Sequence, residues 1–149
     1  MGAIGRDEIA ALIPHAGAMV LLEEVLRWDA TSIVCRTARH RDPGNPLRRG
    51  GRLGVACAVE LAAQAMAAHG RLAGSIGERP REGYLASLRE VVCRGDRLDD
   101  IPGDLLIEVE RLIGEEARVL YRFAVGAGGE VLASGRAAVV LAAEDAGTG

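Results

Sequence analysis

The chain has 149 residues, of which 49% are hydrophobic and 26% charged, and this predicts one globular domain, residues 1–149, with a core of its own. Its net charge of −3 and its aromatic content of only 3% argue against a nucleic-acid partner, because the net charge does not attract phosphates and few side chains can stack on bases. All its strongly basic residues are arginine, so enzymes that form a lysine Schiff base are excluded.

The first part of the chain predicts a short helix, two strands and a long loop. The elements are a helix at 6–12, strands at 19–28 and 32–39, and a loop at 40–53. We expect the helix to begin at Asp7 and to end before Pro14. The loop contains prolines and several glycines, and long ordered loops in compact domains are usually functional.

The second part predicts one long helix followed by four strands. The elements are a helix at 55–72, a loop at 73–82, strands at 83–92, 104–113, 117–127 and 130–141, and a fraying tail after 142. The run Gly126-Ala127-Gly128-Gly129 predicts a hairpin turn. This order indicates an α+β fold in which an antiparallel sheet wraps around one helix. We expect Arg118, Arg122 and Arg136 on the sheet face that the helix leaves open.

Glu60 is the most informative residue, because it is the only carboxylate in a helix built almost wholly of small apolar residues. Such a helix is normally buried, and a buried carboxylate costs free energy unless it is paired, hydrogen-bonded or protonated. We therefore interpret Glu60 as catalytic. The alternative is a glutamate that pairs with an arginine across a dimer interface. Gln64, four residues on, shares its helix face and can orient the carboxylate.

The three histidines differ in what their positions predict. His15 has two interpretations: a functional one, as an acid–base partner or as a group that lines a substrate tunnel, and a structural one, as a residue that bonds to the backbone at a corner. His40 stands between two arginines and is predicted to be a solvated surface residue. His69, nine residues after Glu60, is predicted to point to the opposite side of the helix.

No cofactor, metal or membrane segment is expected. The histidines and the three cysteines, Cys35, Cys57 and Cys93, lack the spacing of metal ligands and predict thiols in a reducing compartment. The N-terminus does not have the basic and apolar regions of a signal peptide, and no apolar run is long enough to cross a bilayer. We expect a cytoplasmic protein.

A series of segments between Ile9 and Leu141 resembles a known family. They are Leu12-Ile13-Pro14-His15, Met19 to Glu23, Glu60 to Met66, Gly83 to Ala86, Pro102 to Asp104, Glu108 to Glu110, and Gly129 to Ala133. Together they resemble the hot-dog-fold (3R)-hydroxyacyl-acyl carrier protein dehydratases of fatty-acid and polyene synthesis. Asn45 to Leu47, Gly51 to Leu53 and Ala65 to Gly70 resemble more closely the dehydratase-like subunits of aryl polyene synthesis.

The resemblance implies a hot-dog fold and the formation of trans-2-enoyl thioesters from 3-hydroxyacyl thioesters. The substrate would be carried on the phosphopantetheine of an acyl carrier protein or on coenzyme A, and the chain would form a homodimer or a hetero-oligomer with another hot-dog subunit. Glu60 would be the acid, and His15 is the best candidate for the base.

The start of the long helix is the expected substrate-binding region. The backbone N–H groups of Gly54, Val55 and Ala56 would stabilise the enolate oxygen, because a helix N-terminus presents N–H groups to negative charge. We also expect Asn45 and Gln64 at the substrate.

One departure from the family leaves alternatives open. Fatty-acid dehydratases have a catalytic histidine in the loop before the helix, where this chain has Asn45 and Pro46. A hot-dog thioesterase that uses Glu60 to activate water, or a non-catalytic partner subunit, are therefore the alternative functions. The loop also contains three arginines, which are either solvated charge or a docking site for an acidic carrier protein: Arg48, Arg49 and Arg52.

Overall fold

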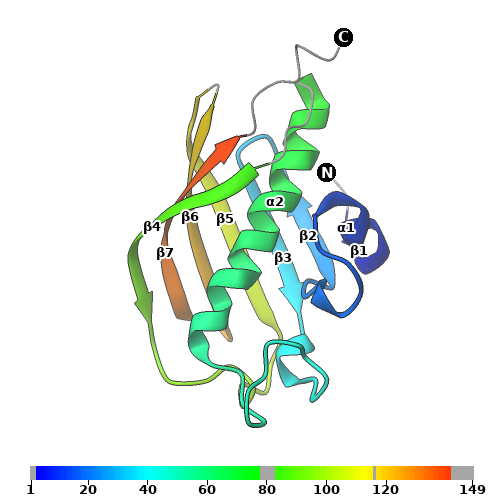
Figure 1. Cartoon of the computed structure of the whole chain (residues 1–149), viewed down its shortest axis with the longest axis vertical. Coiled ribbons are helices and arrows are strands. Elements are labelled where there is room, and N and C mark those ends of the chain that lie inside the picture. The colour runs from blue at the N-terminus through cyan, green and yellow to red at the C-terminus, as the bar shows by residue number, and fades with distance from the viewer. Residues whose placement is uncertain (1–2, 78–82, 116, 142–149) are drawn as a thin grey trace.

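The computed structural model describes residues 3–77, 83–115 and 117–141 (Figure 1). Its strands form one antiparallel sheet of seven strands in the order β1-β2-β3-β5-β6-β7-β4. The elements are β1 (Ile4–Gly5), α1 (Arg6–Leu12), η1 (Gly17–Met19), β2 (Glu24–Trp28), β3 (Ser32–Thr37), η2 (Arg39–Arg41), η3 (Val55–Cys57), α2 (Ala58–Gly77), β4 (Gly83–Cys93), β5 (Leu105–Gly114), β6 (Arg118–Ala127) and β7 (Glu130–Leu141). The predicted hot-dog arrangement of a sheet around one long helix is confirmed.

Helix α2 lies across one face of the sheet, mainly over β3, β5 and β6 (Figure 1). The alternation in β5 explains this packing, since Leu105, Ile107 and Val109 are buried while the residues between them are exposed. Half of the buried residues that the structure describes in α2 are alanine, which lets the helix lie close to its neighbours. The opposite face is open to solvent and bears Arg118, Arg122 and Arg136 as predicted.

The predicted strand at 19–28 is wrong in its first half, because β2 begins only at Glu24. A strand on a half-open sheet exposes alternate side chains, but residues 20–22 are all buried. Their backbone groups are bonded largely by side chains from other elements, as described below. The high proportion of apolar residues in this segment therefore indicates burial and not a strand.

Other boundaries differ by smaller amounts. The long helix begins with a 3-10 turn at Val55 and continues to Gly77, beyond the predicted end at residue 72, so part of the predicted loop 73–82 is helical. Residues 78–82, residue 116 and the tail after 141 lie outside the described residues. Helix α1 has its predicted extent, but its N-cap is Gly5 and it begins at Arg6 and not at Asp7.

The predicted hairpin between the last two strands is confirmed. Gly128 and Gly129 have φ angles of 58° and 81°, so both central residues of this two-residue turn adopt the left-handed conformation that favours glycine. Strands β6 and β7 pair on either side of the turn, from Ala127↔Glu130 to Arg118↔Val140. The turn thus fixes the register of the longest strand pair.

Candidate active site

Glu60 and His15 meet at the start of α2. The Nε2 atom of His15 lies 2.9 Å from Oε1 of Glu60. The two side chains are 27% and 34% exposed, so the pair is partly shielded and open on one side. In the described part of the chain Glu60 forms no ion pair with an arginine. His15 therefore contacts the carboxylate as the first of its two interpretations expects, and its catalytic role stays a prediction.

Gln64 connects this pair to the segment that leads from His15 into the core. It is fully buried, and its Nε2 donates a hydrogen bond to the Met19 carbonyl at 2.7 Å and lies 3.4 Å from Glu60 Oε1. Its Oε1 accepts a bond from the Leu21 N–H at 3.0 Å. The Gln64 amide therefore attaches the segment that follows His15 to the helix that bears Glu60. Its contact with substrate stays a prediction.

Two arginines hold the same segment from the other side. Arg6 of α1 donates to the carbonyls of Gly17 at 2.9 Å and Val20 at 3.2 Å. Arg39 donates to the carbonyls of Ala18 at 3.2 Å and Val20 at 2.7 Å. Charged donors make hydrogen bonds about twice as strong as neutral ones. For residues 17–20 these side-chain bonds take the place of the backbone hydrogen bonds that a neighbouring strand would form. They were not predicted.

The start of α2 is held by the segment before β5. The N–H groups of Val55 and Leu98 donate to the carbonyls of Asp96 and Leu53, at 3.0 and 2.8 Å. The Asp99 carboxylate accepts a bond from the Leu53 N–H at 2.9 Å. The Arg97 guanidinium, which hydrogen-bonds this carboxylate, holds the pKa of Asp99 well below its usual range.

This arrangement bears on the predicted enolate site. Gly54, Val55 and Ala56 lie at the start of the helix as expected, and Glu60 follows within one turn. The Val55 N–H is already bonded to the Asp96 carbonyl, so it is the least available of the three donors. The contribution of Gly54 and Ala56 to substrate binding stays a prediction.

Asn45 is buried and its amide bonds the loop to itself. Its Nδ2 donates to the Arg39 carbonyl at 2.9 Å, and its Oδ1 accepts from the Leu47 N–H at 2.9 Å. The amide therefore stabilises the loop before the helix. A contact of Asn45 with substrate stays a prediction, and it requires one of these bonds to open.

The prediction that His40 is a solvated surface residue is wrong. Its side chain is only 1% exposed, and its Nε2 lies 3.0 Å from the Ile101 carbonyl. Burial lowers the pKa of His40. Successive side chains of a 3-10 turn point in directions about 120° apart, so the ring faces inward although Arg39 and Arg41 flank it.

His69 points away from Glu60, as predicted. It is fully buried, and its Nε2 and Nδ1 lie 2.9 Å from the Asp29 carbonyl and 3.2 Å from the Tyr121 hydroxyl. Because the carbonyl can only accept, Nε2 bears the proton and Nδ1 accepts from the hydroxyl. Burial lowers the pKa of His69 and raises the pKa of Tyr121 to about 12, so both stay neutral near pH 7. This pair belongs to the core.

The three loop arginines, Arg48, Arg49 and Arg52, keep their charge without a carboxylate partner in the described residues. Arg48 donates to the carbonyls of Gly51 and His40, at 2.8 and 3.2 Å, and Arg49 donates to the Pro46 carbonyl at 3.0 Å. These bonds shape the loop and leave its positive charge uncompensated.

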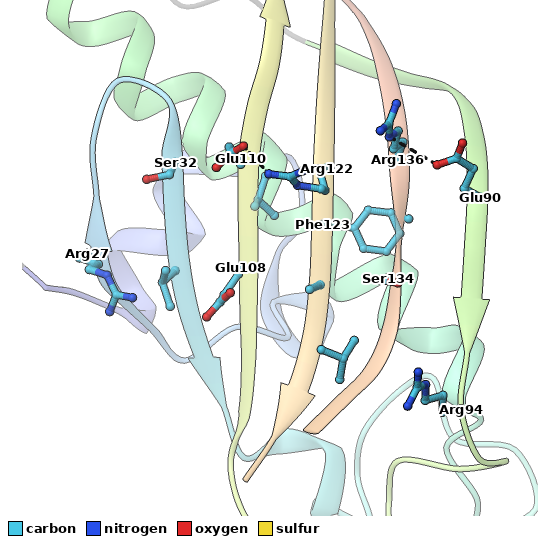
Figure 2. Close-up of a pocket in the computed structure, with 15 residues that line it drawn as sticks. Arg27, Ser32, Glu90, Arg94, Glu108, Glu110, Arg122, Phe123, Ser134 and Arg136 are labelled. Atoms are coloured by element: carbon cyan, nitrogen blue, oxygen red, sulfur yellow. Dashed lines mark hydrogen bonds and ion pairs between the residues drawn. The ribbon is translucent and has the colours of Figure 1, made fainter. Parts of the chain in front are cut away.

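A groove of about 640 Å³ crosses the open face of the sheet, on the side away from α2 (Figure 2). Four of its seven charged side chains form ion pairs, since Arg122 contacts Glu110 at 2.6 Å and Arg136 contacts Glu90 at 3.5 Å. Neither Glu60 nor His15 lines it. The candidate pair at the start of α2 therefore lies outside this groove.

Two further findings concern the described residues. They contain no group of three or more His, Cys, Asp or Glu side chains arranged to hold a metal ion. None of their helices is both long and apolar enough to span a membrane.

Comparison with known proteins assigns the family. The sequence model of the ApeP-like family, which is described as ApeP dehydratase, matches residues 7–147. The chain therefore belongs to the ApeP-like dehydratase family, and it is a hot-dog dehydratase. The predicted hydro-lyase class is confirmed. A search of curated proteins gives no match.

Solved structures show the same fold. The dehydratase heterocomplex ApeI:P from Xenorhabdus doucetiae has a TM-score of 0.80 at 24% identity, covering 91% of each chain. Thioesterase superfamily member 2 of zebrafish has a TM-score of 0.65 at 19% identity, covering 92% of this chain and 95% of its own. A thioesterase from Haemophilus influenzae has a TM-score of 0.65 at 13% identity, covering 93% of this chain and 91% of its own.

Proposed function

We propose that the chain dehydrates 3-hydroxyacyl thioesters to trans-2-enoyl thioesters and that the contact pair of Glu60 and His15 supplies its acid–base chemistry. The observation that supports this most directly is the 2.9 Å contact between His15 Nε2 and Glu60 Oε1 at the start of the central helix. Elimination of water requires a group that removes the proton next to the carbonyl and a group that protonates the departing hydroxyl. A carboxylate held by an imidazole provides the titratable group without a histidine in the loop before the helix.

The substrate is proposed to arrive on the phosphopantetheine of an acyl carrier protein. The loop that leads into α2 exposes Arg49 and Arg52, and no carboxylate of the described residues neutralises them. A cluster of uncompensated arginines attracts phosphate and acidic protein surfaces. Because this loop leads directly to the start of α2, a carrier protein bound here would deliver its thioester close to Glu60.

We also propose that another hot-dog subunit pairs with the β4 edge. This strand has a neighbour on one side only, and Leu85, Leu88 and Val91 are 46%, 40% and 39% exposed. An exposed apolar edge strand is a site for pairing with another chain. The heterocomplex with the similar fold supports a different hot-dog subunit as the partner. We expect the assembly to work in the cytoplasm.

The experiment is to follow enoyl absorbance with a 3-hydroxyacyl thioester, alone and with a candidate partner subunit, for the wild type and the Glu60→Gln variant. We expect the variant to lose about two to four orders of magnitude in kcat, which is the usual contribution of acid–base catalysis. Turnover that is the same in both proteins would refute the role of Glu60.

One observation favours a second function. Asn45 and Pro46 stand where fatty-acid dehydratases have the loop histidine, and a thioesterase that activates water with Glu60 needs no such residue. Release of free thiol without enoyl formation would establish this alternative. Inertness of the isolated protein, with the same activity restored by a partner subunit for the wild type and for Glu60→Gln, would establish a non-catalytic subunit.

A further inference from the structure

We infer that Glu60 exchanges protons with the substrate through its Oε2 atom and that His15 is a positioning residue, a neutral imidazole that donates its Nε2–H to Glu60 Oε1. This inference rests on the proposed function, because it assigns the roles within the same pair. It differs from the roles that the family resemblance implied, in which Glu60 is the acid and a histidine is the base, because here Glu60 takes both roles.

The first step of the argument concerns the other ring nitrogen of His15. Its Nδ1 atom is buried and has no hydrogen-bond partner among the described residues. An imidazole has three states in which to make the contact with Glu60: protonated on both nitrogens, on Nδ1 alone, or on Nε2 alone. The first two place an N–H donor at the buried Nδ1 with no acceptor for it.

The cost of an unpaired buried donor decides between these states. Leaving a buried polar group without a partner costs about 1–3 kcal/mol, and more for a charged group. Buried N–H groups without an acceptor are rarer in proteins than acceptors that lack a donor. The state with its proton on Nε2 alone keeps the ring uncharged and leaves only an acceptor unpaired at Nδ1, and it directs the N–H at the Glu60 carboxylate 2.9 Å away.

The same geometry removes His15 as the base. A base needs a nitrogen lone pair that faces the substrate. The Nε2 atom of His15 is occupied by Glu60, and Nδ1 is buried. Neither nitrogen is therefore open to a thioester at the start of α2.

The two oxygens of Glu60 differ in their surroundings. Oε1 lies 2.9 Å from His15 Nε2 and 3.4 Å from Gln64 Nε2, so both donors face one oxygen. Oε2 forms no hydrogen bond within the described chain, and it is not buried. Oε2 is thus the accessible oxygen of the pair. Because Oε1 accepts in both protonation states of the carboxyl group, the proton can move on and off Oε2 without rearrangement of these bonds.

These positions allow Glu60 to act twice in one elimination. Oε2 takes the proton from C2 of the 3-hydroxyacyl thioester, and the electron pair of that C–H bond forms the C2=C3 double bond as the C3–O bond breaks. The departing hydroxyl takes the proton back from Oε2 and leaves as water. The carboxylate is regenerated, and no other reactant is needed.

The test separates proton removal from dehydration. A saturated acyl thioester of pantetheine, which lacks the 3-hydroxyl, is incubated in deuterium oxide, and exchange at C2 is measured for the wild type, Glu60→Gln, His15→Gln and His15→Leu. The glutamine in His15→Gln supplies an N–H donor at a position close to Nε2 but cannot act as a base. Thermal unfolding of each variant checks that it is folded.

We expect Glu60→Gln to abolish exchange, His15→Leu to slow it about a hundredfold and His15→Gln to restore it to within about tenfold of the wild type, in line with the usual contribution of acid–base groups and of one hydrogen bond. Equal losses in His15→Gln and Glu60→Gln would overturn the assignment. A wild type that exchanges C2 hydrogen but never forms enoyl product refutes the dehydratase proposal and leaves the roles intact.

A second measurement does not depend on activity. The ¹⁵N chemical shifts of the His15 ring report which nitrogen is protonated. We expect Nε2 to be protonated and Nδ1 unprotonated in the folded full-length chain at neutral pH. A protonated Nδ1, or two protonated nitrogens, overturns the inference whatever the protein catalyses.

Discussion

The amide of Gln64 lies one helical turn from Glu60 and bonds to the backbone that follows His15. The Met19 carbonyl and the Leu21 N–H both use this side chain, at 2.7 and 3.0 Å, while its Nε2 also faces Glu60 Oε1. One buried side chain thus sets the distance between the two members of the candidate dyad. This explains why the helix contains a fully buried glutamine among its alanines.

Replacing this amide should affect both stability and activity. In Gln64→Met, which keeps the side-chain length, the Leu21 N–H and the Met19 carbonyl lose their partners. We expect the free energy of unfolding to fall by about 2–4 kcal/mol, because each unsatisfied buried group costs about 1–3 kcal/mol. Urea denaturation measures this loss. A kcat that stays at the wild-type level in the folded variant would contradict the positioning role.

Arg39 predicts a separate effect on the same segment. Arg39→Leu removes the bonds to the Ala18 and Val20 carbonyls, at 3.2 and 2.7 Å, so His15 is held less firmly. We expect kcat to fall about tenfold with little change in KM, because misplacement of an acid–base pair affects the reaction step more than binding.

The neighbouring Arg41 supplies the matched control. It lies in the same 3-10 turn, but its one ion pair within the described residues is with Asp104, at 3.6 Å on the surface. An exposed pair of this kind contributes about 0–1 kcal/mol. Arg41→Leu should therefore leave kcat and stability nearly unchanged. Equal losses in both variants would attribute the effect to charge and not to the bonds of Arg39.

The fold could be predicted from the sequence because local patterns of residues indicate most of its helices and strands. Alternation of apolar and polar residues indicated β3, turn residues separated the strands β5, β6 and β7, and the alanine-rich run indicated α2. The sequence also indicated both Glu60 and His15 as candidate catalytic residues. Their contact was not predictable, because it depends on how the segment after His15 docks on α2 through bonds between residues far apart in the sequence.

Two incorrect predictions, a strand at residues 20–22 and an exposed His40, also result from contacts between residues far apart in the sequence. Residues 20–22 were interpreted as strand because they are apolar, but the bonds from Arg6, Arg39 and Gln64 leave no pattern in neighbouring residues. His40 was assigned to the surface from its two arginine neighbours, although the direction of each side chain depends on the 3-10 turn. Local rules describe which residues can be buried, and tertiary contacts decide which ones are.

The loop arginines predict how the substrate carrier is recognised. In the double variant Arg49→Gln/Arg52→Gln we expect KM to rise about tenfold for a substrate on an acyl carrier protein, because the attraction of opposite charges raises association rates by at least about tenfold. For the same acyl group on pantetheine alone, KM should not change. Steady-state kinetics with both substrates measures the difference.

The open face of the sheet provides the control for charge. Arg118 is exposed on that face, away from the start of α2. Arg118→Gln removes one positive charge and should leave KM for the carrier-bound substrate unchanged. If the loop variant raises KM equally for both substrates, the arginines shape the loop and do not bind the carrier.

The buried imidazoles His40 and His69 predict a dependence of stability on pH. Burial lowers the pKa of both, so they are neutral in the folded chain and bind protons more readily when it is unfolded. The unfolded state therefore gains stability as the pH falls below the ordinary histidine pKa of about 6.5. We expect the free energy of unfolding to decrease between pH 7.5 and the lower folded-state pKa, by up to about 1.4 kcal/mol per pH unit for each imidazole.

Urea denaturation at pH 7.5, 6.5 and 5.5 tests this, with His69→Gln as the decisive variant. This change removes one titrating group, so the loss of stability between these pH values should be smaller than in the wild type, even though the variant is less stable at pH 7.5. Asp29 and Asp99, whose pKa values are lowered by hydrogen bonds, affect stability only at lower pH and do not interfere. A variant with the same pH slope as the wild type would show that His69 does not change its proton affinity on folding.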